Sequence, residues 1–140
     1  MAGNTLFLSP SRLFRVQWNE KVTGLPEGVF GDVSFEHMVL ENAWNLSVIH
    51  PGAVLQSKDR LQHLQIHYTP LEDFSWEILP QLANLLFFDF TDSSITTLPA
   101  LHSPTLQSLA LWNNHISTVE VGWSAPNLEV LIMGESNCSE

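Results

Sequence analysis

Hydrophobic residues recur along this chain in a fixed order: one apolar position, then two alternating ones, then a polar residue, then two more apolar positions. The clearest copy comprises Leu106, Leu109, Leu111, Asn114, Ile116 and Val119. The same spacing occurs earlier in Leu85, Phe88, Phe90, Ser93, Ile95 and Leu98, and before that in Leu61, Leu64, Ile66, Thr69, Leu71 and Phe74. Three consecutive copies predict a repeat architecture rather than an ordinary packed domain.

The pattern weakens outward from these three copies. Downstream it continues through Leu128, Leu131, Met133 and Ser136. Upstream, one unit beginning at Phe35 and a weaker one beginning at Ser11 each need one extra residue to fit. We therefore expect about six units over residues 11–140, starting near residues 11, 35, 61, 85, 106 and 128, after an N-terminal segment, residues 1–10, of undefined structure.

Each unit is expected to contain one short strand followed by a turn. The fourth and sixth positions, such as Leu109 and Leu111, alternate like a strand and should point together into the core. A polar residue follows where the chain leaves the strand, and its side chain can bond to backbone groups that have no partner in the sheet. Only seven residues, including Pro99 and Pro104, separate Leu98 from Leu106. A regular helix does not fit there, so irregular or 3₁₀ return segments are expected.

These units resemble the leucine-rich repeat superfamily. The resemblance implies an α/β-type leucine-rich repeat solenoid, with short parallel strands on the concave face and mostly irregular or 3₁₀ returns on the convex face. The alternative is a mixed α/β domain that is merely rich in leucine. A non-enzymatic protein-interaction scaffold, binding its partner on the concave face, is the function that the resemblance favours.

A narrower resemblance rests on phrases in the returns: Gly24-Leu25-Pro26-Glu27-Gly28-Val29-Phe30, His50-Pro51-Gly52-Ala53, Ile78-Leu79-Pro80-Gln81-Leu82, Leu98-Pro99-Ala100-Leu101 and Ala125-Pro126-Asn127-Leu128-Glu129. They are similar to arthropod secreted repeat proteins named after the Oplophorus-luciferin 2-monooxygenase non-catalytic subunit. That resemblance implies a secreted, non-catalytic accessory subunit of an oxidative enzyme. An innate-immune recognition ectodomain is a further alternative. The family carries a secretion signal and cysteine-bearing caps, and neither is recognised here, so we expect a truncated chain.

The charge distribution narrows the partner class. All five basic residues lie within the first sixty positions, and from Leu61 onward the chain has nine carboxylates and no Lys or Arg. Nucleic acids and anionic membranes are therefore disfavoured as partners, because both require Lys and Arg. No stretch approaches the about 20 apolar residues of a membrane span. A protein partner is expected.

Catalytic and metal chemistry find little support in the sequence. It contains no Gly-x-Ser-x-Gly, no phosphate-binding Gly-rich loop and no His-Glu-x-x-His motif, so we expect neither an enzyme nor a cofactor. His63 and His67, four residues apart on a strand, would be about 13 Å apart, too far to share one metal ion. His37 and His63 could be lateral neighbours, but no third ligand is identified. The single cysteine, Cys138, aligns with core positions and cannot form an internal disulfide.

The candidate binding residues are the variable positions of the strands, which should face away from the core. Those with the chemistry of an interface are His63, His67, Tyr68, Phe87, Asp89 and Trp112. His67, Thr91 and Trp112 should share one row across the sheet. Exposed aromatic residues of this kind are typical of binding hot spots, although they could instead shield the sheet. Asn45 and Asn137 begin two Asn-x-Ser sequons and are candidate glycosylation sites.

Overall fold

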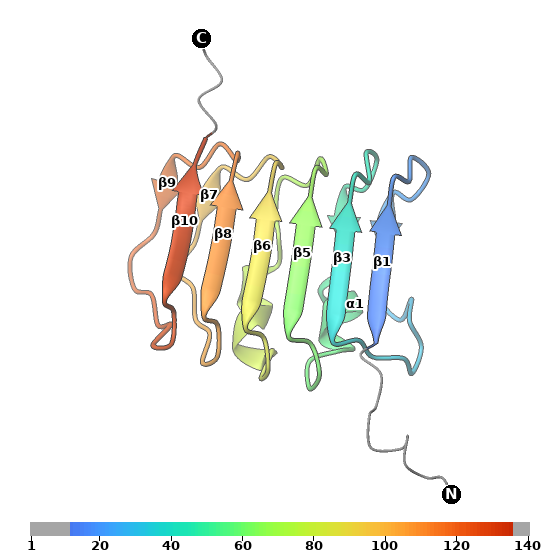
Figure 1. The fold of residues 1–140 in the computed structure, drawn as a ribbon, viewed down its shortest axis with the longest axis horizontal. Helices are drawn as coiled ribbons and strands as arrows, with labels where there is room; N and C mark the ends of the chain where they lie inside the picture. Colours follow the sequence, from blue (N-terminus) through green and yellow to red (C-terminus); the bar gives the residue numbers. More distant parts are fainter. Residues whose placement is uncertain (1–11, 136–140) are drawn as a thin grey trace, which may run out of the picture.

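The computed structural model describes residues 12–135, and its main element is a parallel sheet of six strands (Figure 1). The strands follow one another in chain order across the sheet, and each is five residues long. They are β1 (Leu13–Gln17), β3 (His37–Glu41), β5 (His63–His67), β6 (Phe87–Thr91), β8 (Ser108–Trp112) and β10 (Val130–Gly134). Each strand pairs with the corresponding strand of the next unit, which makes residues 12–135 a parallel β solenoid with few helices.

The return segments form a second layer behind the sheet (Figure 1). Two pairs of two-residue strands lie there: β2 (Gly24–Leu25) with β4 (Val48–Ile49), and β7 (Thr97–Leu98) with β9 (Thr118–Val119). One return contains a 3₁₀ helix, η2 (Trp76–Gln81). Another contains a short α-helix, α1 (Pro51–Leu55), which the sequence pattern did not predict.

The short helix α1 has a clear local cause. Pro51 occupies its first turn, where the missing N–H costs nothing and the fixed φ suits a helix. The preceding residue, His50, accepts a hydrogen bond from the Gly52 N–H at its Nδ1, at 2.9 Å. The two prolines between Leu98 and Leu106 have no such arrangement, and that return stays irregular, as expected.

The core lies between the sheet and the returns. In the central strands the residues predicted to point inward are fully buried, and they meet across the sheet: Leu64 lies opposite Phe88, and Phe88 opposite Leu109. Phe88 and Phe90 pack against Phe74 and Trp76, with ring centroids 5.0–6.2 Å apart. Trp76 is thus a core residue.

In the six-stranded sheet, every strand except β10 is followed by a non-glycine residue with positive φ, between 52° and 55°. These residues are Trp18, Asn42, Tyr68, Asp92 and Asn113. The left-handed conformation costs energy for a residue with a Cβ, so the sharp exit from the strand must be held by the surrounding bonds. The next residue in each unit belongs to the predicted polar column.

The polar column forms the expected backbone bonds at Asn114, while other units depart from this arrangement. Buried Asn114 donates from its amide to the Phe90 carbonyl at 2.6 Å and accepts from the Ile95 N–H at 3.1 Å. Thr69 and Ser93 replace this amide with a shared hydroxyl contact of 3.2 Å. In the unit of β3 the column holds Ala43, which is buried and has no polar side chain to contribute.

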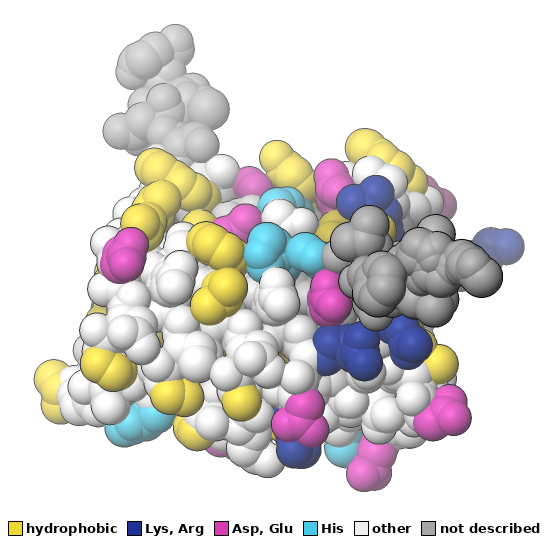
Figure 2. Space-filling model, turned by 60° about the horizontal axis from the view of Figure 1, so that its bottom comes forward, with side chains coloured by type: hydrophobic (Ala, Val, Ile, Leu, Met, Phe, Trp, Pro, Cys, Tyr) yellow, Lys and Arg dark blue, Asp and Glu magenta, His cyan; other side chains and the backbone are white. Residues whose placement is uncertain are grey.

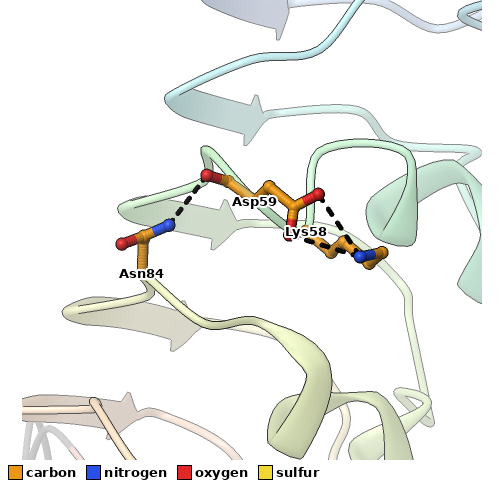
Figure 3. A network of polar contacts seen from close by, with 3 residues as sticks. All are labelled: Lys58, Asp59 and Asn84. Atoms are coloured by element: carbon orange, nitrogen blue, oxygen red, sulfur yellow. Dashed lines mark hydrogen bonds and ion pairs between the residues drawn. The ribbon is translucent and has the colours of Figure 1, made fainter.

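A second set of polar clamps joins neighbouring units just before the strands. Asn84 donates to the Asp59 carbonyl of the preceding unit at 2.7 Å, beside an ion pair between Lys58 and Asp59 (Figure 3). Thr105 repeats the arrangement with the Leu85 carbonyl at 2.8 Å, and Asn127 repeats it with the Pro104 carbonyl at 2.6 Å. These bonds set the spacing between turns of the solenoid on the side opposite the strand exits.

Two expectations fall outside the described residues. Cys138, which was aligned with the core, and Asn137, the second sequon, both lie beyond residue 135. Within residues 12–135, no helix is long and apolar enough to cross a membrane.

Candidate partner-binding surface

The candidate residues lie on or beside one surface, the face of the six-stranded sheet that points away from the core, hereafter the outer face. His63 and His67 are the first and last residues of β5, Phe87 begins β6, Asp89 is at its centre, and Trp112 ends β8. Tyr68 follows β5 directly, at the strand exit. Alternation along parallel strands in register therefore brings together residues that are up to 49 positions apart in the sequence.

Three rings stack side by side where the strands begin. His37 lies opposite His63, and His63 opposite Phe87, in the register of β3, β5 and β6. The His37 and His63 ring centroids are 4.5 Å apart, and those of His63 and Phe87 are 4.7 Å apart, both edge to face. The lateral contact of the two histidines was expected from the sequence, whereas the role of Phe87 as the third ring emerges only from the register.

The environment of His63 disfavours its charged form. Burial lowers the pKa of the His63 imidazole, and repulsion from His37 lowers it further, against a smaller opposing effect of Asp89. This ring therefore tends to remain neutral. Within residues 12–135, no group of three or more His, Cys, Asp or Glu side chains is arranged to hold a metal ion.

Asp89 is the carboxylate at the centre of the outer face. It lies between Gln65 and Ala110 in the register, so its nearest neighbours on both flanking strands are uncharged. Its Oδ2 is 4.0 Å from Nε2 of His67, and both side chains are about one-third exposed. The carboxylate thus remains accessible from solution.

Three aromatic side chains stand out from this region. Phe87 is 39% exposed, Trp112 44% and Tyr68 48%. Thr91 lies opposite His67 in the register, as expected, but it is buried and adds little to the surface. The ends of β6 and β8 remain side by side next to Thr91, because the Asp92 N–H donates to the Trp112 carbonyl at 2.9 Å.

Basic side chains are distributed unevenly along the length of the solenoid. Figure 2 shows histidine side chains beside hydrophobic ones, while Lys and Arg side chains lie toward the N-terminal end of the sheet. The basic residues of that end include Arg12 and Arg15, both exposed. The part of the outer face formed by β5, β6 and β8 is consequently aromatic and acidic.

A second exposed aromatic pair was missed by the sequence reasoning. Trp18 and Trp44 follow β1 and β3, and their ring centroids are 6.3 Å apart. Both are well exposed. Their spacing of 26 residues, close to one repeat, is the signal that could have placed them together.

The first sequon is accessible. Asn45 is exposed, next to the fully buried Leu46, and its side-chain amide donates to the Glu20 carbonyl of the preceding unit. Ser47 of the same sequon is also exposed. The amide nitrogen to which a glycan would be attached is therefore at the surface, although it takes part in a clamp between units.

Two cavities of the described region are lined by residues other than the candidates. One of about 350 Å³ is lined by Leu111, Ile116, Val119 and Met133 near the edge strand β10. Another of about 350 Å³ lies between η2 and the following return, and its lining includes Trp76, Pro99 and His102. The candidate surface is therefore an open face rather than a pocket, which suits a macromolecule better than a small substrate.

Comparison with known proteins yields one distant relationship to report. No family model matches the chain. Over 125 residues, or 86% of its length, it is 30% identical to the Oplophorus-luciferin 2-monooxygenase non-catalytic subunit of Oplophorus gracilirostris. The chain spans 35% of the length of that protein. By its name, this distant homologue is a subunit that does not carry catalysis, in agreement with the resemblance seen in the return segments.

Proposed function

We propose that this chain is a non-enzymatic scaffold of the leucine-rich repeat type, whose outer face is the concave face and binds a protein partner. The observation that carries the proposal is the group of exposed aromatic residues, Phe87, Trp112 and Tyr68, around Asp89 and His67. Aromatic residues at the centre of a surface supply most of the binding energy in protein interfaces. The division of residues 11–140 into about six units is part of this proposal.

The sheet under these residues is well suited to present them. Except for Tyr68, which follows β5 directly, each of these residues belongs to a strand with buried alternate residues, such as Phe88 between Phe87 and Asp89. A backbone held in this way loses little freedom when a partner binds, so more of the contact energy remains as affinity. The exposed rings add little to the core, which leaves recognition as the better explanation for them.

The proposal is tested by capturing partners from tissue extract on the purified chain and on a Trp112→Ala/Tyr68→Ala double variant. We expect the double variant to lose capture of the partner. A Trp44→Ala/Val121→Ala variant is the matched control, since it removes two exposed apolar side chains away from this surface. Circular dichroism verifies that both variants are folded. Equal capture by the folded double variant would contradict the assignment of the surface.

A second candidate is supported by the comparison: an accessory, non-catalytic subunit of a secreted oxidative enzyme. Its support is the name of the distant homologue. An extracellular location belongs to this candidate, and the accessible Asn45 sequon is compatible with it. Co-purification of the chain with a separate catalytic protein would favour this candidate, whereas partners without enzymatic activity would favour the general scaffold.

A further inference from the structure

We propose that the outer face recognises a lysine or arginine side chain of its protein partner, bound between the Asp89 carboxylate and the rings of Trp112 and Phe87. This inference rests on the proposed function and specifies the chemistry of the partner. Three features of the described residues support it: the space beside Asp89, the nature of its walls, and the charge of the surrounding surface.

The space is set by the register of β6 and β8. Asp89 lies opposite Ala110, whose side chain is only a methyl group. Phe87 precedes Asp89 by two residues on the same face, about 7 Å along the strand. Trp112 follows Ala110 by two residues on the same face, about 7 Å along the strand, and its ring lies beside Gly134 of β10. A long side chain can therefore lie over Ala110 with an aromatic residue at each end.

The walls suit a cation. A lysine ammonium or arginine guanidinium is attracted to the face of an aromatic ring, most strongly to that of tryptophan. The apolar stem of the same side chain can pack against a ring such as Phe87 while its charged head reaches the carboxylate. A purely apolar anchor would cover Asp89 and leave the carboxylate without water or a partner, which is costly.

The surrounding charge favours the same ligand. No Lys or Arg follows Arg60 in the sequence, so β5, β6, β8 and β10 contribute no permanently positive side chain. The contact of Asp89 with a group able to carry positive charge is the 4.0 Å approach of His67. Asp92 and Glu135 add further negative charge at the strand exits. The surface therefore attracts basic segments and repels acidic ones.

The test uses a library of random dodecapeptides displayed on phage and selected against the full chain. Enriched peptides should be rich in Lys or Arg. Their affinity, measured by fluorescence anisotropy, should fall about tenfold for Asp89→Asn, because a charged contact becomes a neutral one of the same shape. Raising the salt concentration from about 0.05 to about 0.5 M should weaken binding as well, by screening.

Two controls separate this inference from the proposed function. Glu77→Gln makes the same charge change on the 3₁₀ helix η2 and should leave affinity unchanged. Trp112→Leu, compared with Trp44→Leu, tests the surface without changing charge. Some peptides could lose affinity for the Trp112→Leu variant and yet contain no excess of basic residues, or bind the Asp89→Asn variant unchanged. Either result would contradict the cationic ligand but would still support the outer face as the binding surface. Peptides insensitive to both changes, or the absence of any enriched peptide, overturn both.

Discussion

The middle of the sheet and its last strand carry the same sequence pattern but differ in burial. In β8, Leu109 and Leu111 are fully buried, whereas the equivalent Leu131 and Met133 of β10 are each 42% exposed. Strand β8 has a neighbour on both sides, while β10 pairs only with β8 among the described residues. In a solenoid the core of each unit is therefore completed by the next unit. The same residue type consequently contributes different amounts to the free energy of unfolding in different turns.

The largest expected effect is on stability, through the loss of an inward leucine. Leu109→Ala should lower the free energy of unfolding by about 2–5 kcal/mol, because it opens a cavity in a fully packed region. Leu131→Ala should cost about 1 kcal/mol or less, since much of that side chain is already in water. Urea denaturation followed by circular dichroism measures both changes. Equal losses in the two variants would show that β10 is as well packed as the middle of the sheet.

A medium effect is expected for the polar side chains that hold neighbouring turns together. Asn114→Ala should lower the free energy of unfolding by about 1–3 kcal/mol, because the Phe90 carbonyl and the Ile95 N–H lose their buried partner. Asn127→Ala, at the exposed clamp before β10, should cost about 0.5–1.5 kcal/mol, because water can replace its bond to the Pro104 carbonyl. The same denaturation measurements apply, and the reverse ranking of the two variants would contradict the comparison.

The smallest expected effect is a pH dependence of the stability, which arises from His63 on the outer face in the middle of the sheet. The pKa of His63 is lowered in the folded chain, so the unfolded chain binds a proton more readily, and stability should fall as pH decreases below about 6.5. The groups facing His63 are His37, which adds to this effect, and Asp89, which opposes it. Denaturation at about pH 7.5 and about pH 5 should show a smaller difference for His63→Gln than for the unchanged chain.

His102→Gln serves as the control for the pH experiment. It removes an exposed imidazole from a return segment rather than from the outer face. We expect the pH dependence of its stability to match that of the unchanged chain. An identical reduction in both variants would show that the place of His63 in the sheet is not the cause.

Much of the sheet could be predicted from the sequence because its rule is local. Alternation within five residues decides which side chains share a face, so Leu64 and Ile66 were correctly predicted to be buried, and His63 and Asp89 to lie on the opposite face. The polar column was visible for the same reason, since Asn114 and its hydroxyl substitutes occur at a constant distance from the strand.

The sequence pattern failed where neighbouring units decide the outcome. Thr91 shares the alternation of Asp89, yet it is buried. The helix α1 depends on the cap supplied by His50, and the Trp18–Trp44 pair depends on how two turns align. Trp18 belongs to the weakest copy of the pattern, where the extra residue hides its alignment.

The sequence by itself thus determined the repeat, the inward and outward sides of the central strands, and the acidic character of everything beyond Arg60. The tertiary structure alone decided that His63 packs between His37 and Phe87, that Ala110 lies opposite Asp89, and that Leu131 is less buried than Leu109. The physical reason is the same in each case. Alternation along a strand is a property of one unit, whereas burial, ring contacts and the exposure of a carboxylate depend on the register between units.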